Sequence, residues 1–417
     1  MSEKHNFYGV GERVVDTLLL YALSDLARTA DPRSTFSWNL GREIIFALSS
    51  SKPEIKDKML DVLKSNARSI SMAERLNFKL NVGKEWKVNS VACLYCTGNW
   101  KKVRAKKNEK REVEKTEDKK IEPACKMKGE CGKINIPAYA VFSYSLHKLK
   151  SIDWPNAYSI SKNKGKGYET LYIGLSPFWS KGVRQWDTEW KEHSSYVPSA
   201  IQVLLLYALS KYAIIIPGET LIELIFSPSL GTHSYRDANR IMNLVKRLIT
   251  RFSISVKNIH IEELPISVVP LVMLSQMDLP SIIELSRREL ALLFVAYDMD
   301  RGVPKNPRGY EERSLVDVAN FYSRLGNSFW DFKRMIGDLV NQMWRIEFKT
   351  RILDILIDFS YAISGRNLWR LNDALFKVRV LADDLARTGT QIHLLQPCSA
   401  FNIQRAIEIR QNLNEFT

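Results

Sequence analysis

Between Lys101 and Lys120 the chain carries ten basic and five acidic residues with almost nothing apolar. A composition of this kind cannot form a hydrophobic core, so the segment is expected to stay solvated. Four of the five cysteines flank it, namely Cys93, Cys96, Cys125 and Cys131. The segment is therefore predicted to be a loop attached to the rest of the chain through two pairs of cysteines.

The spacing of these cysteines predicts a structural zinc site. Cys93 and Cys96 are separated by two residues, the spacing of a zinc knuckle, whereas five residues separate Cys125 from Cys131. Four thiolates would form a closed tetrahedral shell with no position for a catalytic water. The alternative is four ordinary thiols in a surface insertion, although free cysteines usually prefer a core. Five cysteines in 417 residues are too few for a disulfide scaffold and favour a reducing compartment.

Strand-like patterns flank the cysteine segment on both sides. The alternation of residues 86–92 leads directly into Cys93, and apolar and aromatic residues follow Cys131 at Ile134, Ile136 and Tyr139–Ser145. The sequence therefore predicts a small, zinc-ribbon-like insertion between two strands.

Helical patterns dominate the two ends of the chain. Arg13–Ala27 is predicted to be an apolar helix, and Ser37 or Asn39 could cap a second helix that begins before Ile44. Helices are also expected after Ser314, from about Phe329 to Gly365, and from Asn367 to Gly389. We expect a mixed, helix-rich α+β fold with four parts: an N-terminal helical part (1–90), the zinc-binding insertion (91–135), a central α/β part (136–310) and a C-terminal helical bundle (311–417).

The longest apolar stretch, Ala200–Pro217, is interrupted by polar residues and is shorter than the ~20 apolar residues of a membrane-spanning helix. It predicts a buried core helix that runs into a strand. Within it, Leu204–Ser210 repeats Leu18–Ser24 residue for residue. No regular period accompanies the match, which on sequence alone is interpreted as chance.

The charge of the chain favours a polyanionic partner. Lys and Arg number 61 against 46 Asp and Glu, which leaves a net charge of +15 and a pI near 9.4. A surplus of this size attracts nucleic acid. Residues 1–13 lack the features of a signal peptide, so a cytoplasmic protein without membrane contact is expected.

Residues 235–252 give the clearest helical pattern. At 100° per residue, four arginines fall in a stripe about 60° wide that contains no acidic residue: Arg236, Arg240, Arg247 and Arg251. Such a stripe repels itself unless phosphates or acidic side chains lie opposite. It therefore predicts a phosphate-binding face, with an ordinary solvated face as the alternative.

A second basic segment contains Lys162, Lys164 and Lys166 interleaved with Gly165 and Gly167. Its glycines allow close approach to a phosphate chain or a groove, and the loop to Tyr168 is predicted to inspect duplex DNA. The alternative is a solvated surface loop. Neither this loop nor Gly9-Val10-Gly11 is a Walker motif. Three nearby tryptophans could stack on bases but are more often core residues: Trp179, Trp186 and Trp190.

The sequence argues more for binding than for turnover. The six histidines are scattered, without the spacing of a metalloprotease or phosphohydrolase. Asp298 and Asp300 could hold a divalent ion for phosphodiester cleavage, but two carboxylates that close a helix are usually solvated. We expect no enzymatic activity; a metal-dependent nuclease or RNA-processing enzyme that uses this aspartate pair is the alternative.

These features resemble the large subunit of archaeal type I-A CRISPR Cascade complexes: a basic chain of this length, a cysteine-pair insertion between strands, basic surfaces and a helical C-terminal part. Large subunits of related subtypes carry a paired Cys-x-x-Cys signature. Cys93 and Cys96 match its first half, whereas Cys125 and Cys131 are spaced differently from its second half. The resemblance concerns the general arrangement of parts along the chain.

The resemblance implies a non-enzymatic role in antiviral defence. A large subunit of this kind contacts the guide RNA and works together with the other Cascade subunits. It recognises the short motif that flanks the target in double-stranded DNA, starts strand separation, and recruits the CRISPR helicase-nuclease. Within this role, the basic residues above are the expected nucleic-acid contacts.

Overall fold

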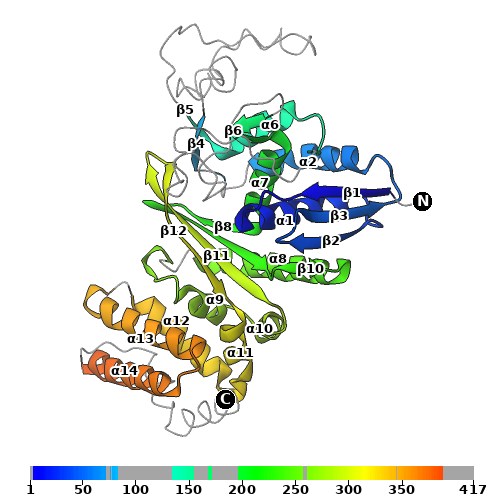
Figure 1. Cartoon of the computed structure of the whole chain (residues 1–417). Helices are drawn as coiled ribbons and strands as arrows, with labels where there is room; N and C mark the ends of the chain where they lie inside the picture. The colour runs from blue at the N-terminus through cyan, green and yellow to red at the C-terminus, as the bar shows by residue number, and fades with distance from the viewer. Residues whose placement is uncertain are drawn as a thin grey trace. The chain divides into compact units, whose positions relative to one another are not determined.

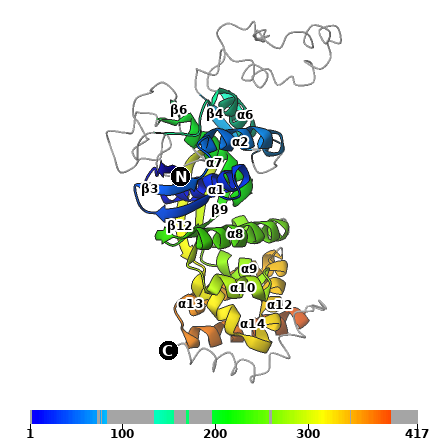
Figure 2. The ribbon, with the colours of Figure 1, turned by 90° about the vertical axis from the view of Figure 1, so that its right-hand side faces the viewer.

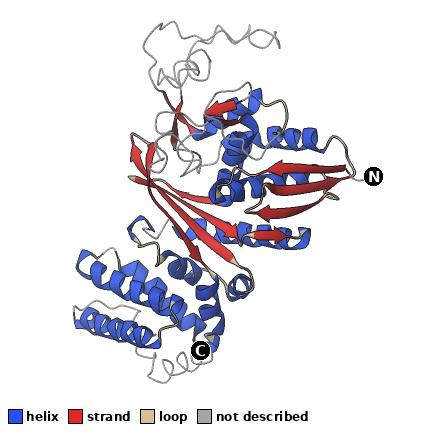
Figure 3. Cartoon of the chain, viewed as in Figure 1, coloured by secondary structure: helices blue, strands red, loops and turns tan. Residues whose placement is uncertain are grey.

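The fold is mixed α+β and rich in helices (Figures 1 and 3). The computed structural model describes residues 3–71, 76, 78–82, 134–154, 168–170, 196–256, 261–343 and 345–387. The chain divides into two compact units. The first comprises Met1–Lys211, Ile215–Leu221 and Ala296–Arg308, and the second comprises Tyr212–Ile214, Ile222–Val295 and Gly309–Thr417.

The first unit begins with strands packed on a buried helix. Its elements are, in chain order, β1 (Glu3–Tyr8), α1 (Arg13–Ala30), β2 (Thr35–Leu40), β3 (Ile44–Ser50) and α2 (Ile55–Ser71). β3 lies between β1 and β2 and is antiparallel to both. Trp38 of β2 donates its indole N–H to Ser24 of α1 at 2.7 Å and packs edge-on against Tyr21. These contacts fix the strands on α1, which is buried along almost its whole length.

The predicted helix α1 is confirmed, but the second predicted helix is wrong. Ser37 and Asn39, expected to cap it, lie inside β2. Phe36, Trp38 and Leu40 are buried at every second position. This period of two places the apolar side chains on one face of a strand, and the intervening polar residues only imitate helix caps.

Two paired strands flank residues 83–133, which lie outside the described part of the chain. β4 (Lys79–Val82) is antiparallel to β5 (Ile134–Pro137), with Val82 opposite Ile134. Residues 139–145, predicted as a strand, instead belong to the helix α6 (Ala138–Lys148). Val141, Phe142, Ser145 and Leu146 are buried, the i, i+1, i+4, i+5 pattern of a helical face that packs against α2.

The long apolar stretch forms a buried helix that runs directly into a strand, as its sequence predicts. β6 (Tyr168–Thr170) pairs antiparallel with β7 (Tyr196–Pro198), which leads into α7 (Ser199–Tyr212) and then β8 (Ala213–Ile216). Residues 200–210 of α7 are all buried. No described helix is both long and apolar enough to cross a membrane.

A second set of strands is ordered β12, β11, β9, β8. The ranges are β9 (Thr220–Pro228), β11 (Leu290–Asp300) and β12 (Val303–Ser314). β11 and β12 are joined at Arg301 and Gly302, whose φ angles of 53° and 80° are those of a tight hairpin turn. Asp298 and Asp300 therefore lie in a strand, and the expectation that they close a helix is wrong.

Helices make up most of the second unit (Figure 2). After β10 (Gly231–His233) they are α8 (Tyr235–Val256), η4 (Ile261–Glu263), α9 (Val269–Ser275), α10 (Leu279–Ser286), α11 (Val316–Arg324), η5 (Gly326–Ser328), α12 (Phe329–Gln342), α13 (Ile346–Ser364) and α14 (Leu368–Arg387). The ring of Phe332 packs edge-on against Phe321, Tyr322 and Phe359, which joins α11, α12 and α13. The C-terminal helices expected from the sequence are present, although the segment after Phe329 is two helices and not one.

The two copies of the seven-residue repeat occupy corresponding places. Each copy starts five residues after the first residue of its helix, Arg13 in α1 and Ser199 in α7. Two strands that pair with each other, β2 and β3, separate α1 from α2, whereas three strands, β8, β9 and β10, separate α7 from α8, and β10 lies in a different sheet from β8 and β9. The order of elements after the two copies therefore differs, and the match stays interpreted as chance.

Candidate nucleic-acid interface

The arginine stripe lies on α8, the helix predicted most clearly from the sequence. Ser234 precedes it, donates to the Asp237 carboxylate at 2.7 Å and accepts from the Asp237 backbone N–H at 3.3 Å. This reciprocal arrangement caps the first turn. One face of the helix is buried through Ile241, Leu244, Val245, Leu248, Ile249 and Phe252. The burial of this face turns the arginines outward.

Five basic residues lie at exposed positions of α8, namely Arg236, Arg240, Lys246, Arg247 and Arg251, and the one acidic residue of the helix, Asp237, has a side chain that is 42% exposed. The ammonium of Lys246 lies 5.5 Å from the centroid of the Tyr212 ring, which keeps the lysine stem close to the protein surface. At 1.5 Å per residue, Arg236 and Arg251 are about 22 Å apart along the helix. The exposed face is therefore long enough to follow several phosphates of one strand.

Two arginines of the stripe have acidic partners supplied by the neighbouring helix. α10 packs against α8 (Figure 2). Arg247 pairs with Glu284, and Arg251 pairs with Asp278, the residue that caps α10. Burial raises the pKa of Asp278, but hydrogen bonds from Ser281 and the charge of Arg251 outweigh it and leave the pKa below its usual value. Both ion pairs are partly exposed and orient the guanidinium groups along the edge of α10.

Arg236 and Arg240, the other two arginines of the stripe, lie near an aspartate that is paired with a different arginine. Asp237 forms an ion pair of 3.2 Å with Arg288. Hydrogen bonds from Ser234 and Arg288, and to a smaller extent the charge of Arg240, lower the pKa of Asp237. Among the described residues, neither Arg236 nor Arg240 forms an ion pair or side-chain hydrogen bond. Among the described residues, the two guanidinium groups of the stripe without a carboxylate ion-pair partner thus lie in the first two turns of α8.

The aspartates of the alternative enzymatic hypothesis lie at the end of β11. Asp298 and Asp300 are two residues apart in the strand and so share a face. The guanidinium of Arg308 in β12 is 3.9 Å from the carboxylate of Asp298, and both side chains are more than half exposed. Nowhere in the described ranges do three His, Cys, Asp or Glu side chains gather as metal ligands.

The remaining residues singled out in the sequence lie outside the described residues. These are the cysteines Cys93, Cys96, Cys125 and Cys131, the lysines Lys162, Lys164 and Lys166, and the tryptophans Trp179, Trp186 and Trp190. What the structure adds is the pairing of β4 with β5. It brings Val82 and Ile134, the residues on either side of the cysteine segment, opposite each other.

The Gly9-Val10-Gly11 loop holds a carboxylate of its own chain. The backbone N–H groups of Val10 and Gly11 donate to the two carboxylate oxygens of Asp16 at 2.6 and 3.1 Å. A Cβ atom on Gly9 would lie 2.5 Å from Ile45 and 2.9 Å from Asp16, so only glycine fits there. The loop thus binds an internal anion in place of a phosphate.

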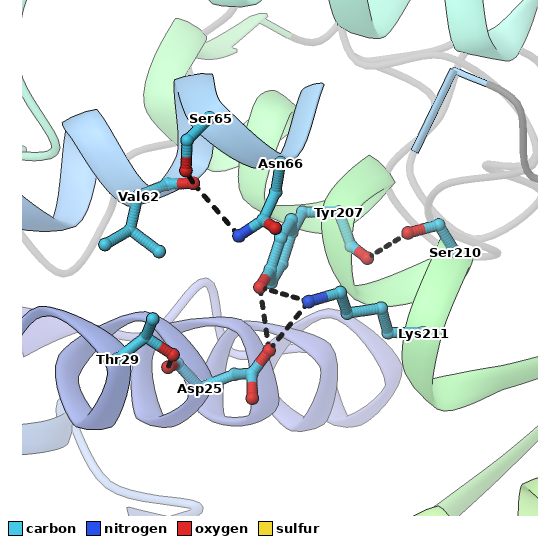
Figure 4. A network of polar contacts seen from close by, with 8 residues as sticks. All are labelled: Asp25, Thr29, Val62, Ser65, Asn66, Tyr207, Ser210 and Lys211. Carbon is cyan, nitrogen blue, oxygen red and sulfur yellow. Dashed lines mark hydrogen bonds and ion pairs between the residues drawn. The ribbon is translucent and has the colours of Figure 1, made fainter. Parts of the chain in front are cut away.

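A buried polar network joins α1 to α7 (Figure 4). The Tyr207 hydroxyl donates to Asp25 at 2.7 Å, and the Lys211 ammonium reaches the same carboxylate at 3.1 Å and the hydroxyl at 2.7 Å. Burial, together with the nearby Asp25 charge, raises the pKa of Tyr207, so this phenol stays protonated. Sequence reasoning missed this network, although its signal is visible: Asp25 and Lys211 each directly follow one copy of the seven-residue repeat.

A comparison of the sequence with protein-family models finds no match, and neither does a comparison with curated proteins.

Proposed function

We propose that this chain binds nucleic acid without catalysing a reaction on it. The observation that supports binding is the exposed face of α8, which carries five basic residues against one acidic residue, Asp237, that is paired with Arg288. The net charge of +15 acts in the same direction. The more specific proposal rests on the resemblance: the chain serves as the large subunit of a complex similar to type I-A Cascade. Its partners are then guide RNA, target double-stranded DNA, the other subunits and the helicase-nuclease.

Within this proposal the four arginines of α8 differ in role. Arg236 and Arg240 contact phosphates directly, since no described side chain neutralises them through an ion pair. Arg247 and Arg251 are held by Glu284 and Asp278, so a phosphate that approaches them must compete with a carboxylate. The first two turns of α8 therefore supply most of the electrostatic binding.

Two further parts of the proposal concern residues outside the described ranges. A structural zinc ion bound by Cys93, Cys96, Cys125 and Cys131 would fix a charged segment that has no core of its own. The lysines Lys162, Lys164 and Lys166 would contact duplex DNA beside the target, where the motif of a large subunit is recognised.

The competing proposal is a nuclease that uses Asp298 and Asp300. The position of Arg308 weighs against it, because a metal ion on Asp298 would lie next to a guanidinium group. Incubation of the purified chain with Mg²⁺ or Mn²⁺ and labelled DNA and RNA tests this alternative. Cleavage that Asp298→Ala abolishes would favour the enzyme.

The binding proposal is tested by removing Arg236 and Arg240 together. The double alanine variant should bind duplex DNA more weakly, with a log–log salt slope that is shallower by about 0.9 for each lost phosphate contact. The loss should be nearly independent of DNA sequence. The measurement is fluorescence anisotropy of a labelled duplex over a series of salt concentrations.

A matched control removes the same charge elsewhere. Arg42 and Lys64 are exposed residues of the first unit, outside α8, and their double alanine variant keeps the same net charge as the test variant. It should retain the affinity and salt slope of the unmodified chain. If both variants lose the same affinity and salt slope, the effect comes from the overall charge of the chain. If the Arg236 and Arg240 variant loses neither, a phosphate-binding role for α8 is contradicted.

A further inference from the structure

Trp330 presents a large aromatic surface to solvent at the start of α12. Its side chain is 62% exposed, whereas the adjacent Phe329 is completely buried. The two rings contact each other edge-on, with centroids 5.1 Å apart. Phe329 thus anchors the first turn of α12 in the core while the indole of Trp330 stays accessible.

A lysine fixes this indole from its own helix. Lys333 lies one turn after Trp330, and its ammonium is 5.2 Å from the centroid of the indole ring. The same ammonium donates to the backbone carbonyl of Met277 at 2.8 Å, which holds the lysine in place. The cation and the ring are therefore arranged before any ligand arrives.

The residues that hold Lys333 are next to an ion pair of the arginine stripe. Asp278, the residue after Met277, forms the ion pair with Arg251 of α8. Burial lowers the pKa of Lys333, the charge of Asp278 opposes this change and the charge of Arg251 adds to it. Two cations and one carboxylate thus lie close together, so the basic character of α8 continues to Trp330.

The surroundings of Trp330 differ from those of a protein-docking face. Among the described residues of α12, Trp330 is the only exposed large hydrophobic side chain. By contrast, Trp369, Phe376 and Val380 of α14 are all exposed and recur at helical spacing on one face. A single aromatic ring beside cations suits a flat base joined to a phosphate, whereas an apolar stripe suits another protein surface.

We propose that Trp330 stacks on a nucleobase of a single strand whose phosphates follow Arg251 and the exposed face of α8. Lys333 holds the ring, and its charge favours the adjoining phosphate. This inference rests on the proposed function of α8 and names its ligand class, an unpaired strand. A base inside a duplex cannot reach the ring without leaving its stack.

The test compares two substrates of equal length, a labelled poly-dT oligonucleotide and a labelled duplex, with the full-length chain. Trp330→Ala should weaken binding of the single strand by about 10-fold and leave duplex binding within about twofold. The salt slope should not change, because no phosphate contact is removed. Trp330→Phe should recover most of the loss, since it keeps a stacking surface.

Trp369→Ala is the control, because it removes an even more exposed indole from α14. It should leave the binding of both substrates unchanged. Equal losses for both substrates in Trp330→Ala, or no loss in either, would overturn the stacking role. If Arg236→Ala with Arg240→Ala still lowers the salt slope in that case, the binding role of α8 survives and only the inference about Trp330 fails.

Discussion

Asp16 keeps its carboxyl group buried in the first turn of α1, and this burial raises the pKa to about 6. The hydrogen bonds from Val10 and Gly11 act in the opposite direction but do not cancel the effect. The folded chain therefore binds this proton more tightly than the unfolded chain does. Ionisation of Asp16 costs stability, and the cost grows as the pH rises from about 4 to about 6.

The resulting prediction concerns the difference between the unmodified chain and Asp16→Asn. Between pH 4 and pH 7 the free energy of unfolding of the unmodified chain should fall relative to the variant by about 2 kcal/mol, since the pKa rises by about two units and part of the change lies below pH 4. Urea unfolding at several pH values measures this difference. Above about pH 6 it should level off, and a difference that stays constant from pH 4 to pH 7 would contradict a raised pKa.

For single residues, the ion-pair partners of the arginines were harder to predict than the positions of the arginines on the helix. The sequence places Arg247 and Arg251 correctly on an exposed helical face. It does not reveal Glu284 and Asp278, because these residues are more than 25 positions away and meet α8 only through the packing of α10. The choice between phosphates and acidic side chains opposite the stripe, which the sequence left open, thus depends on tertiary structure.

Among the helices and strands, those with an unbroken apolar period were predicted best. α1, α7 and α8 have long buried faces, so a single periodicity identifies each of them. β2 was misread because Ser37 and Asn39 are also common helix caps. α6 was misread because Tyr139 and Phe142 are common in strands, although burial at helical spacing decides its structure.

The pairing of α10 with α8 leads to a prediction for Glu284→Gln. This change frees Arg247 from its carboxylate while keeping a side chain of similar size. Affinity for nucleic acid should rise, and the salt slope should steepen by about 0.7 on single strands or about 0.9 on duplexes. Stability should change by less than about 1 kcal/mol, because the ion pair is partly exposed.

Glu43→Gln provides the control for this variant, since Glu43 is an exposed residue of the first unit. It makes the same change in net charge but should leave the salt slope unaltered. If Glu284→Gln binds no better than Glu43→Gln, then Arg247 takes no part in binding.

For the molecule as a whole, the proposed zinc site predicts a stoichiometry. Elemental analysis of the purified chain should find one zinc ion per chain. Cys93→Ser together with Cys96→Ser should remove it, whereas Cys398→Ser, which changes the one cysteine outside the cluster, should retain it. Less than about half a zinc ion per chain, with all thiols freely titratable, would exclude the site.

The network between α1 and α7 has a consequence for synthesis. Asp25 is made 182 residues before Tyr207 and 186 residues before Lys211, the two groups that satisfy its carboxylate. At the usual rate of translation, about 5–20 residues per second, this gap lasts roughly 10–40 s. During that time the Asp25 carboxylate lacks its partners from α7. The first unit can complete its buried polar contacts only after half of the chain has emerged.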